Sequence, residues 1–376
     1  MVTPHMPPEQ AANALLPSVL ARELARDGHR TTFLTHSARV ARRSTPAGTV
    51  LVARRGRGAL AQSPLGAVST AARIGVAAAR AFRGVDLVHL HSNGFIIDVA
   101  GWAAARLKRP SVITLYGTDV WHFDPARHGR FAAVVRGAAG RVFYSRALRQ
   151  RAVELELAAP DDPVVYAPVD EMFQAPPVAA REAARRALGF SGPTLLTVKR
   201  LHPVGGYDVL LRAFAALAPR VPDARLFIAG SGELRPELER QAEAAGIASR
   251  VRFLGLVDNQ DLPKYYAAAD LFVLSSRLES WGTVMLEALA CGTPVVATAT
   301  AGALEAQGFF DEDLLLTPLE DAEALAAAVQ RALGSPRRVS SRTHARITST
   351  FTPAACTKAY RDVYTAAIDT FARRHH

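Results

Sequence analysis

The chain has 376 residues, 49% of them hydrophobic and 21% charged, which is typical of a globular protein with two domains of ordinary size. It has no uncharged apolar run of about 18 residues, and no basic segment followed by an apolar core opens it, so we expect neither a membrane span nor a signal peptide. Two cysteines, Cys291 and Cys356, make no disulfide framework and no zinc pattern. A reducing, cytoplasmic compartment fits this composition.

The net charge of +11 is unevenly distributed. Residues 1–175 carry 22 Lys and Arg against 13 Asp and Glu, a net +9, whereas the remainder carries 23 against 21, a net +2. A GC-rich genome explains why only four of the 45 basic residues are lysine, but it does not explain the excess in the first half. The excess predicts an acidic acceptor or an anionic membrane surface as a partner. Nucleic acid is disfavoured, because no basic stripe interleaved with aromatic residues occurs.

Strands and helices alternate along the first half, which predicts an α/β domain with a parallel sheet. Alanine-rich helical stretches occur at 13–28 and 68–81. The expected strands are 31–35, 49–53, 86–91, 111–116, 141–145 and 164–167.

The beginning of the chain is unusual for such a domain. An α/β domain normally opens with an apolar strand, yet residues 1–10 (MVTPHMPPEQ) reach the following loop almost at once. One interpretation is that Met1 lies a few residues after the natural start. The other is that the sheet lacks most of one central strand, which would lower its stability.

The second half repeats the alternation after a polar, proline-containing stretch at 170–193, which is interpreted as an interdomain linker leading into a helix. The tail at 351–374 is amphipathic with a Thr-Pro helix start. Two similar halves predict a cleft with ligands at the C-terminal ends of the strands. The expected strands are 194–198, 225–230, 251–255, 270–275, 294–298 and 313–317.

The most informative stretch is 275–298. An apolar strand leads into a loop that carries Glu279, then Gly282 opens a helix that contains Glu287 about a turn and a half inside. The helix ends where Gly292 suits a left-handed cap and Pro294 cannot continue it.

This arrangement predicts a nucleotide-sugar site. The free amides of Gly282, Thr283 and Val284 form an anion site at a helix N-terminus, which suits a phosphate. Carboxylates on either side accept hydrogen bonds and therefore suit vicinal hydroxyls, such as those of a ribose or a sugar. The alternative, two solvated surface glutamates, fits the strand–loop–helix context poorly.

In series, these motifs resemble the bacterial retaining glycosyltransferases of family 4 (glycosyl transferases group 1), whose GT-B fold has two facing Rossmann-like α/β domains. The resemblance covers essentially the whole chain. It implies an acceptor-binding domain at 1–172, a nucleotide-sugar-binding domain at 173–350 and a helix at 351–376 that packs back on the first domain. The matching segments are 86–92, 116–121, 165–173, 197–214, 228–239, 251–257 and 275–298.

The resemblance assigns donor roles residue by residue. Arg200 matches the arginine that faces the donor diphosphate, although an interdomain salt bridge is an alternative. Glu287 matches the ribose-binding glutamate, and Glu279 the one that holds hydroxyls of the donor sugar. Further donor positions are the loop beside the diphosphate, for which a simple tight turn is the alternative, and the main chain near the nucleobase: Gly230, Gly232, Leu256 and Val257.

On the acceptor side, His91 and Asp119 are the candidates and complete a catalytic set with Arg200 and Glu279. Tyr116 and Trp121 are candidates for lining the acceptor pocket. Alternative interpretations place His91 and Trp121 in the protein core. His89 shares the strand face of His91 but lies deeper, so a structural role is expected for it.

Three positions depart from the family pattern. Gly205 stands where the family usually has a second cationic residue, a lysine, unless Lys199 or His202 takes its place. Tyr116 replaces the family's frequent histidine. The usual glycine-rich loop after the first strand reads PEQAANALL at 8–16.

The resemblance implies transfer of a hexose from a nucleoside-diphosphate sugar to an acceptor hydroxyl with retention, without a metal or other cofactor. A non-catalytic donor-binding relative, acting as a partner or regulatory subunit, is the rival interpretation. A nicotinamide-dependent oxidoreductase is disfavoured, because no G-x-G-x-x-G follows the first strand. The acceptor stays open between a small molecule, such as a secondary metabolite or small glycoside, and a lipid-linked envelope precursor. The expected location is cytoplasmic, with peripheral contact at the inner face of the membrane in the second case.

Overall fold

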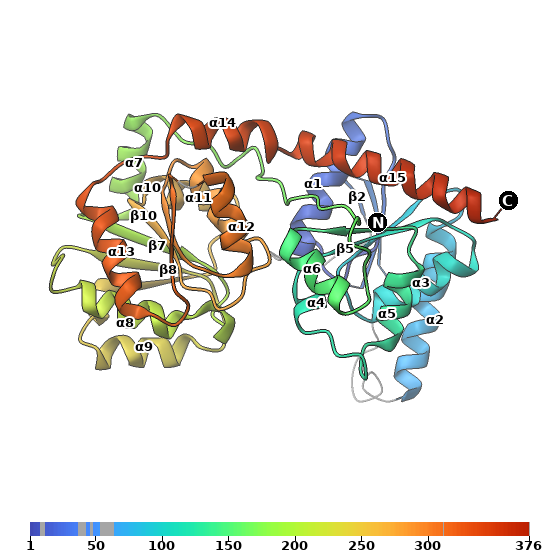
Figure 1. The fold of residues 1–376 in the computed structure, drawn as a ribbon, viewed down its shortest axis with the longest axis horizontal. Coiled ribbons are helices and arrows are strands. Elements are labelled where there is room, and N and C mark those ends of the chain that lie inside the picture. The colour runs from blue at the N-terminus through green and yellow to red at the C-terminus, as the bar shows by residue number, and fades with distance from the viewer. Residues whose placement is uncertain (8–11, 37–42, 46–47, 53–63, 311, 376) are drawn as a thin grey trace. The chain divides into compact units, whose positions relative to one another are not determined.

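A computed structural model describes residues 1–7, 12–36, 43–45, 48–52, 64–310 and 312–375 (Figure 1). The chain forms two compact units, Met1–Pro168 with Pro353–His376, and Val169–Thr352. Helix α15 (Pro353–His375) therefore belongs to the first unit, and the first division falls shortly before residue 172. Part of the loop expected at 8–16 lies outside the described residues. No helix in the described ranges is long and apolar enough to cross a membrane.

The first unit contains two three-stranded sheets with the orders β2-β3-β1 and β4-β5-β6. Every strand pair is parallel except β2 with β3. The strands are β1 (Thr32–Thr35), β2 (Arg43–Thr45), β3 (Gly48–Val52), β4 (Val88–His91), β5 (Ser111–Leu115) and β6 (Gly140–Phe143).

Val2 joins these two sheets. It forms parallel bridges to Leu34 of β1 and to Leu90 of β4. Its amide donates to the His89 carbonyl at 2.7 Å, and its carbonyl accepts from the His91 amide at 2.9 Å. Within the described residues, a bridge thus stands where an α/β domain of this kind normally has a full central strand.

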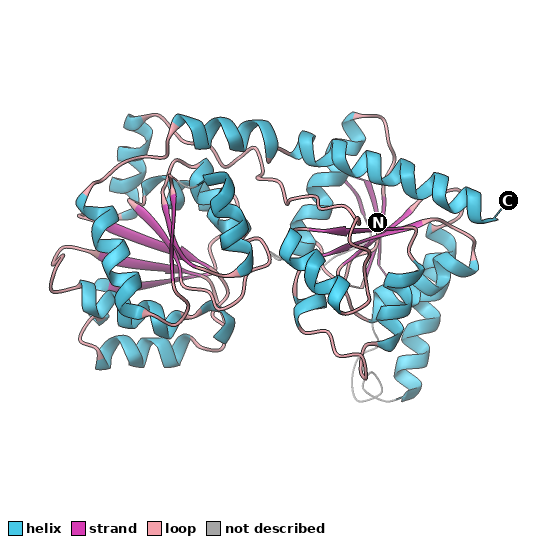
Figure 2. Cartoon of the chain, in the orientation of Figure 1, coloured by secondary structure: helices cyan, strands magenta, loops and turns pink. Residues whose placement is uncertain are grey.

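Helices cover both faces of the first unit's sheet (Figure 2). Because side chains alternate along a strand, Ile113 and Phe143 pack with α2, α3 and α5, whereas Val112 and Val142 pack with α1 and α15. Burial on both faces is typical of a parallel sheet in an α/β domain. The remaining helices of this unit are α1 (Ala12–Arg26), α2 (Pro64–Ala81), α3 (Phe95–Arg106), α4 (Thr118–Trp121), α5 (Gly129–Gly137) and α6 (Arg146–Glu154).

The second unit contains one parallel six-stranded sheet with the order β12-β11-β10-β7-β8-β9. Its strands are β7 (Thr194–Val198), β8 (Arg225–Ala229), β9 (Val251–Gly255), β10 (Leu271–Leu274), β11 (Val295–Thr298) and β12 (Leu314–Thr317). Its helices are α7 (Val178–Leu188), α8 (Tyr207–Leu217), α9 (Arg235–Ala244), α10 (Leu262–Ala268), α11 (Thr283–Ala290), α12 (Ala301–Phe310), α13 (Ala322–Gly334) and α14 (Ser341–Thr350), with 3-10 turns η2 (Pro203–Gly205) and η3 (Ala248–Arg250).

Two details differ from the strands expected from the sequence. The expected strand at 164–167 is wrong, because only Val164 forms a bridge, to Phe143 of β6. Pro163 and Pro168 flank this segment, and proline has no amide to donate to a ladder. The three-residue strand β2 was not expected, since so short a segment carries no readable hydrophobic alternation.

Candidate functional site

The donor residues expected from the sequence gather at one edge of the second unit's sheet. Strands β10, β7, β8 and β9 are parallel neighbours, so the segments that follow them meet at the same edge. Hydrogen bonds link these segments: the Lys199 amide donates to the Ala229 carbonyl at 3.0 Å, and the Gly230 amide to the Gly255 carbonyl at 2.7 Å. Leu256, which follows directly, is 62% exposed.

Arg200 follows the C-terminal end of β7 and is exposed. Among the described residues, its side chain has no hydrogen-bond or ion-pair partner. A guanidinium held at a strand end in this way is available to bind an anion.

Lys199 lies on the Glu279 side of the same strand end. Its Nζ donates to Ser276 Oγ at 2.9 Å and forms an ion pair with Glu279 Oε1. A cation is thus present although position 205 holds glycine. A Cβ on Gly205 would lie 2.6 Å from the ring of Tyr207, whose hydroxyl donates to the Lys199 carbonyl at 2.6 Å. Tyr207 therefore occupies the space beside position 205 and holds the end of β7.

The Gly230–Gly232 loop lies directly on the backbone of the β7 end. A Cβ on Gly230 would be 2.0 Å from the Lys199 carbonyl oxygen, and one on Gly232 would be 2.1 Å from that of Leu201. Any side chain at these positions would push the loop away from the segment that carries Arg200. The two glycines thus have a packing reason beyond a tight turn.

Glu279 lies in the loop between β10 and α11, with its side chain 15% exposed. Ser276 Oγ donates to its Oε1 at 2.9 Å, the same oxygen that pairs with Lys199. Helix α12 supports the loop from behind: the Gly302 amide donates to the Glu279 carbonyl at 3.0 Å. A Cβ on Gly302 would lie 2.6 Å from the Trp281 nitrogen, so the helix contacts the loop backbone directly.

Helix α11 begins as the sequence predicted. Gly282 has φ +76° and precedes the first helical residue, Thr283. No side chain caps this end of the helix. Its first amides, including that of Val284, therefore form the kind of terminus that binds phosphate or carboxylate groups.

Glu287 lies farther along α11 and is partly buried. Loss of hydration raises the pKa of its carboxyl to about 7, and the charge of Asp170 adds to this effect. The Tyr266 hydroxyl donates to Glu287 Oε2 at 2.8 Å and works in the opposite direction. The carboxyl group is thus fixed in orientation and poised to change its charge near neutral pH.

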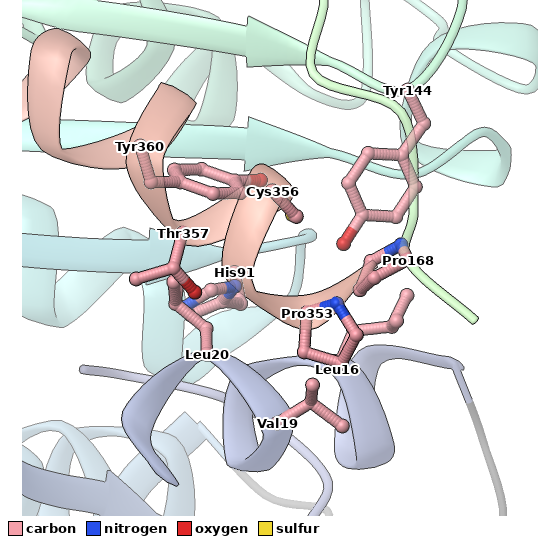
Figure 3. A pocket seen from close by; sticks show the side chains of 10 residues that line it. All are labelled: Leu16, Val19, Leu20, His91, Tyr144, Pro168, Pro353, Cys356, Thr357 and Tyr360. Atoms are coloured by element: carbon pink, nitrogen blue, oxygen red, sulfur yellow. The ribbon is translucent and has the colours of Figure 1, made fainter. Parts of the chain in front are cut away.

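His91, a candidate residue of the first unit, has surroundings that differ from those of the donor residues. The side chain is buried, its Nδ1 bonds the Tyr116 hydroxyl at 2.8 Å, and its ring lies 3.8 Å from that of His89. Burial lowers the pKa of His91 well below its usual value, so it stays neutral. With Thr357 it lines a cavity of only about 10 Å³, too small for a sugar (Figure 3). Among the described residues, the buried Nε2 of His91 has no hydrogen-bond partner, so the acceptor role expected for His91 stays a prediction.

Asp119 is also buried, and its carboxylate is used within its own loop. It accepts the amides of Tyr116 at 3.0 Å and Gly117 at 2.7 Å. Burial raises the pKa of Asp119, while these amides oppose the shift. The geometry therefore gives Asp119 a role in fixing the turn before α4, and the catalytic role expected for it stays a prediction.

Tyr116 and Trp121 lie at the border between the core and the surface. The Tyr116 ring packs edge-on against Tyr144 at 4.7 Å, and Trp121 is partly buried against the first unit's core. His89 has the structural role expected of it: Nδ1 bonds the Tyr364 hydroxyl at 2.7 Å and Nε2 bonds Thr114 Oγ1 at 2.8 Å.

Several residues that shape the donor edge were missed by sequence reasoning. Ser276 directly follows a strand, which was a usable signal. Tyr266, Tyr207 and Gly302 act from neighbouring helices, and no local pattern announced them. In the part of the chain that the structure describes, no cluster of three His, Cys, Asp or Glu side chains is placed to hold a metal.

Two α/β units with parallel sheets, one of them carrying a cation, two carboxylates and an uncapped helix start near one sheet edge, are typical of a GT-B glycosyltransferase. Comparison with solved structures confirms this architecture: the Anabaena protein HepE, solved with UDP and glucose, superposes with a TM-score of 0.78 at 21% identity, covering 97% of this chain and all of HepE.

Sequence comparison gives the family. Residues 19–173 match the model "Glycosyltransferase Family 4" and residues 180–348 match "Glycosyl transferases group 1". A D-inositol 3-phosphate glycosyltransferase of Jonesia denitrificans is 33% identical over 69% of this chain and 68% of its own length. The chain belongs to glycosyltransferase family 4.

Individual relatives resemble this chain over different extents. The mannosylfructose-phosphate synthase of Agrobacterium fabrum is 39% identical over 150 residues, which are 38% of this chain and 33% of that protein. The matched region thus spans about a third of that relative's length. What the comparisons establish is membership of glycosyltransferase family 4.

Proposed function

We propose that this protein is a retaining hexosyltransferase that moves a sugar from a nucleoside-diphosphate donor to an acceptor hydroxyl without a metal ion or other cofactor. The observation that carries the proposal is the convergence at one sheet edge of Arg200, Glu279, the amide end of α11 and Glu287. Two carboxylates, a cation and an anion-binding helix end are the groups that a nucleoside-diphosphate sugar requires.

The donor is bound in three parts. Glu287, oriented by Tyr266, accepts hydrogen bonds from the ribose hydroxyls. The α11 amides at Thr283 and Val284 bind the diphosphate together with Arg200. The Gly230–Gly232 loop approaches the same group, and the main chain at Leu256 and Val257 meets the base.

Glu279 holds hydroxyls of the donor sugar, and its orientation depends on Lys199 and Ser276. Both of these side chains contact Oε1, so Oε2 faces the sugar. Lys199 also places a second positive charge near the departing diphosphate, the charge that Gly205 does not supply. Electrostatic stabilisation of the leaving group by Arg200, Lys199 and the helix amides is the main source of catalysis.

The proposed reaction is a same-face substitution. The bond between the anomeric carbon and the phosphate oxygen breaks, the acceptor oxygen bonds to that carbon from the same face, and the acceptor proton passes to the departing phosphate oxygen. The nucleoside diphosphate leaves with both bonding electrons. No side chain at the donor edge is required as a nucleophile, and the anomeric configuration is retained.

The acceptor binds to the first unit and is a small molecule or a lipid-linked precursor. The two relatives above carry phosphorylated compounds in their names, inositol 3-phosphate and mannosylfructose phosphate. A phosphate on the acceptor suits a first half with a net charge of +9. Tyr116 and Trp121 are the proposed acceptor contacts, and the same excess charge favours contact with an anionic membrane.

A thermal-shift screen tests the donor assignment. The intact chain is heated with UDP, GDP, TDP, ADP and their common sugar conjugates, alongside Glu287→Ala. A ligand that binds only the folded state raises the melting temperature. We expect one nucleotide to stabilise the wild type and not the variant. The absence of any shift would overturn the donor site, whereas binding without transfer to any acceptor would indicate the non-catalytic relative.

A further inference from the structure

A long apolar groove runs over helices of the first unit. Its volume is about 1050 Å³, slightly above the roughly 300–1,000 Å³ of sites that hold a whole organic ligand. Helices α2, α3 and α5 enclose it. Six of the lining residues are Val68, Ala72, Val76, Val99, Trp102 and Val134.

The groove follows the length of α3. It begins at Phe95, shortly after the C-terminal end of β4, and extends to Arg109 and Ser111 at the start of β5. A helix of twelve residues spans about 18 Å, which gives the groove the shape of a channel for an extended chain. On α2, Val68, Ala72 and Val76 recur every four residues and form one continuous apolar wall.

Large apolar side chains in this groove are unusually exposed. Trp102 is 62% exposed, Val68 66% and Val76 52%. Contiguous exposed apolar surface of this kind marks a binding surface. Trp102 has the amphipathic ring that favours the boundary between water and a membrane.

Positive charge frames the groove. The three helices carry five arginines, at 73, 80, 106, 130 and 136, against a single acid, Asp98, which lines the groove near Arg130. Arg109 and Arg130 line the groove themselves. Arg80 lies four residues after Val76 and therefore one turn farther along the same face of α2. The Arg106 guanidinium lies 5.8 Å from the centre of the Trp102 ring. An apolar channel with a cationic rim is complementary to an anionic amphiphile.

We propose that this groove takes up the hydrocarbon chain of an anionic membrane lipid, with the headgroup against the rim arginines. The apolar groove and the rim arginines both contribute, because buried hydrocarbon and Lys or Arg side chains near an anionic surface each strengthen association with a membrane. The inference deepens the membrane contact named under the proposed function. Lipid binding in the groove requires neither a nucleotide-sugar donor nor a transfer reaction. A test can therefore exclude the lipid site without excluding the proposed glycosyltransferase function, and the reverse.

Vesicle flotation of the intact chain without donor is the first test. Vesicles of phosphatidylglycerol mixed with phosphatidylcholine are compared with vesicles of phosphatidylcholine alone, at low and high salt. We expect binding to the anionic vesicles, weakened by salt. Lipids brominated in the acyl chain should quench Trp102, because its ring lies in the groove. Trp102→Phe should lose most of this quenching, because Trp121 is partly buried against the core and Trp281 is buried.

Gly75→Leu tests the groove itself. Gly75 lines the groove in the middle of α2, and a Cβ there would meet nothing within 4 Å. Leucine fills the channel and also favours the helix, so loss of folding is not expected. Gly308→Leu is the matched control, an exposed glycine of α12 with equally open space. We expect at least tenfold weaker vesicle binding for Gly75→Leu and no change for the control.

Replacing Arg109 or Arg130 with glutamine should weaken anionic-vesicle binding roughly fivefold each. The proposal is overturned if the wild type ignores anionic vesicles, or if Gly75→Leu binds them as the wild type does. It is also overturned if the chain forms a concentration-dependent dimer that Gly75→Leu abolishes, since a second copy would then be the occupant.

Discussion

The two units share one architecture, but the candidate residues near their strand ends have opposite surroundings. In the second unit, Arg200 is exposed and Glu279 keeps one carboxylate oxygen for a ligand. In the first unit, His91 is the last residue of β4 and Asp119 lies in α4 after β5, yet both are buried and bonded within their own unit.

The difference arises from what covers each edge. Helix α15 brings Tyr360 and Tyr364 against His89, and the rings around His91 close the space that a ligand would need. In the second unit, Trp281 of the Glu279 loop packs with Phe309 and Phe351, yet the Glu279 side chain remains 15% exposed. A residue's place at a strand end therefore does not decide its chemistry; the helix packed over that end does.

Arg200→Ala should give the largest effect. If the arginine stabilises the departing diphosphate, kcat falls by about 10²–10³-fold while the fold is retained. Steady-state kinetics with the donor found by thermal shift measure this. Arg225→Ala, an exposed arginine at the opposite edge of the same sheet, is the control and should keep wild-type activity. Equal activity of Arg200→Ala and Arg225→Ala would show that the donor edge does not take part in catalysis.

Lys199→Met should reduce kcat/KM by roughly tenfold to a hundredfold, the value of a charged hydrogen bond. The lysine holds Glu279 and supplies the second cation, so Lys199→Arg should recover part of the loss. If Lys199 were purely structural, its replacement would instead lower the melting temperature without a selective loss of kcat/KM. That result would exclude a role for Lys199 in catalysis.

Glu287→Gln should change how stability depends on pH. The folded pKa of about 7 exceeds the ordinary value of 4.5, so the folded state binds more protons between these values and loses stability as pH rises through them. Glutamine does not titrate, so the Glu287→Gln variant does not lose stability in this way as the pH rises. Its free energy of unfolding relative to wild type should therefore rise by about 2–3 kcal/mol from pH 4.5 to about pH 8, as measured by urea denaturation. A constant difference would show that the carboxyl is not desolvated.

His91→Asn should have the smallest effect on catalysis. The histidine is neutral and enclosed, so kcat/KM should stay within about threefold of wild type, with an unchanged pH profile from about pH 5 to pH 8. Loss of its hydrogen bond to Tyr116 should lower stability by about 1 kcal/mol, which denaturation measures separately. A hundredfold loss of activity at wild-type stability would show that His91 has a direct catalytic role. The two units would then not differ in this respect.

The sequence by itself determined the α/β alternation, the α11 helix with its glycine start, and the positions of Glu279 and Glu287. These features are local: strand periodicity, helix caps and turn glycines depend on residues only a few positions apart. The segment at 164–167 shows the limit, because its apolar run predicted a strand that the flanking prolines prevent.

Only the tertiary structure decided which of these groups face a ligand. The Lys199–Glu279 pair joins residues 80 positions apart, and the Tyr266–Glu287 bond joins residues 21 apart. The burial of His91 depends on α15, more than 260 residues later in the chain. The groove beside Trp102 likewise exists only because three helices enclose it. Such contacts are set by packing between elements, and no pattern within one element records what will cover it.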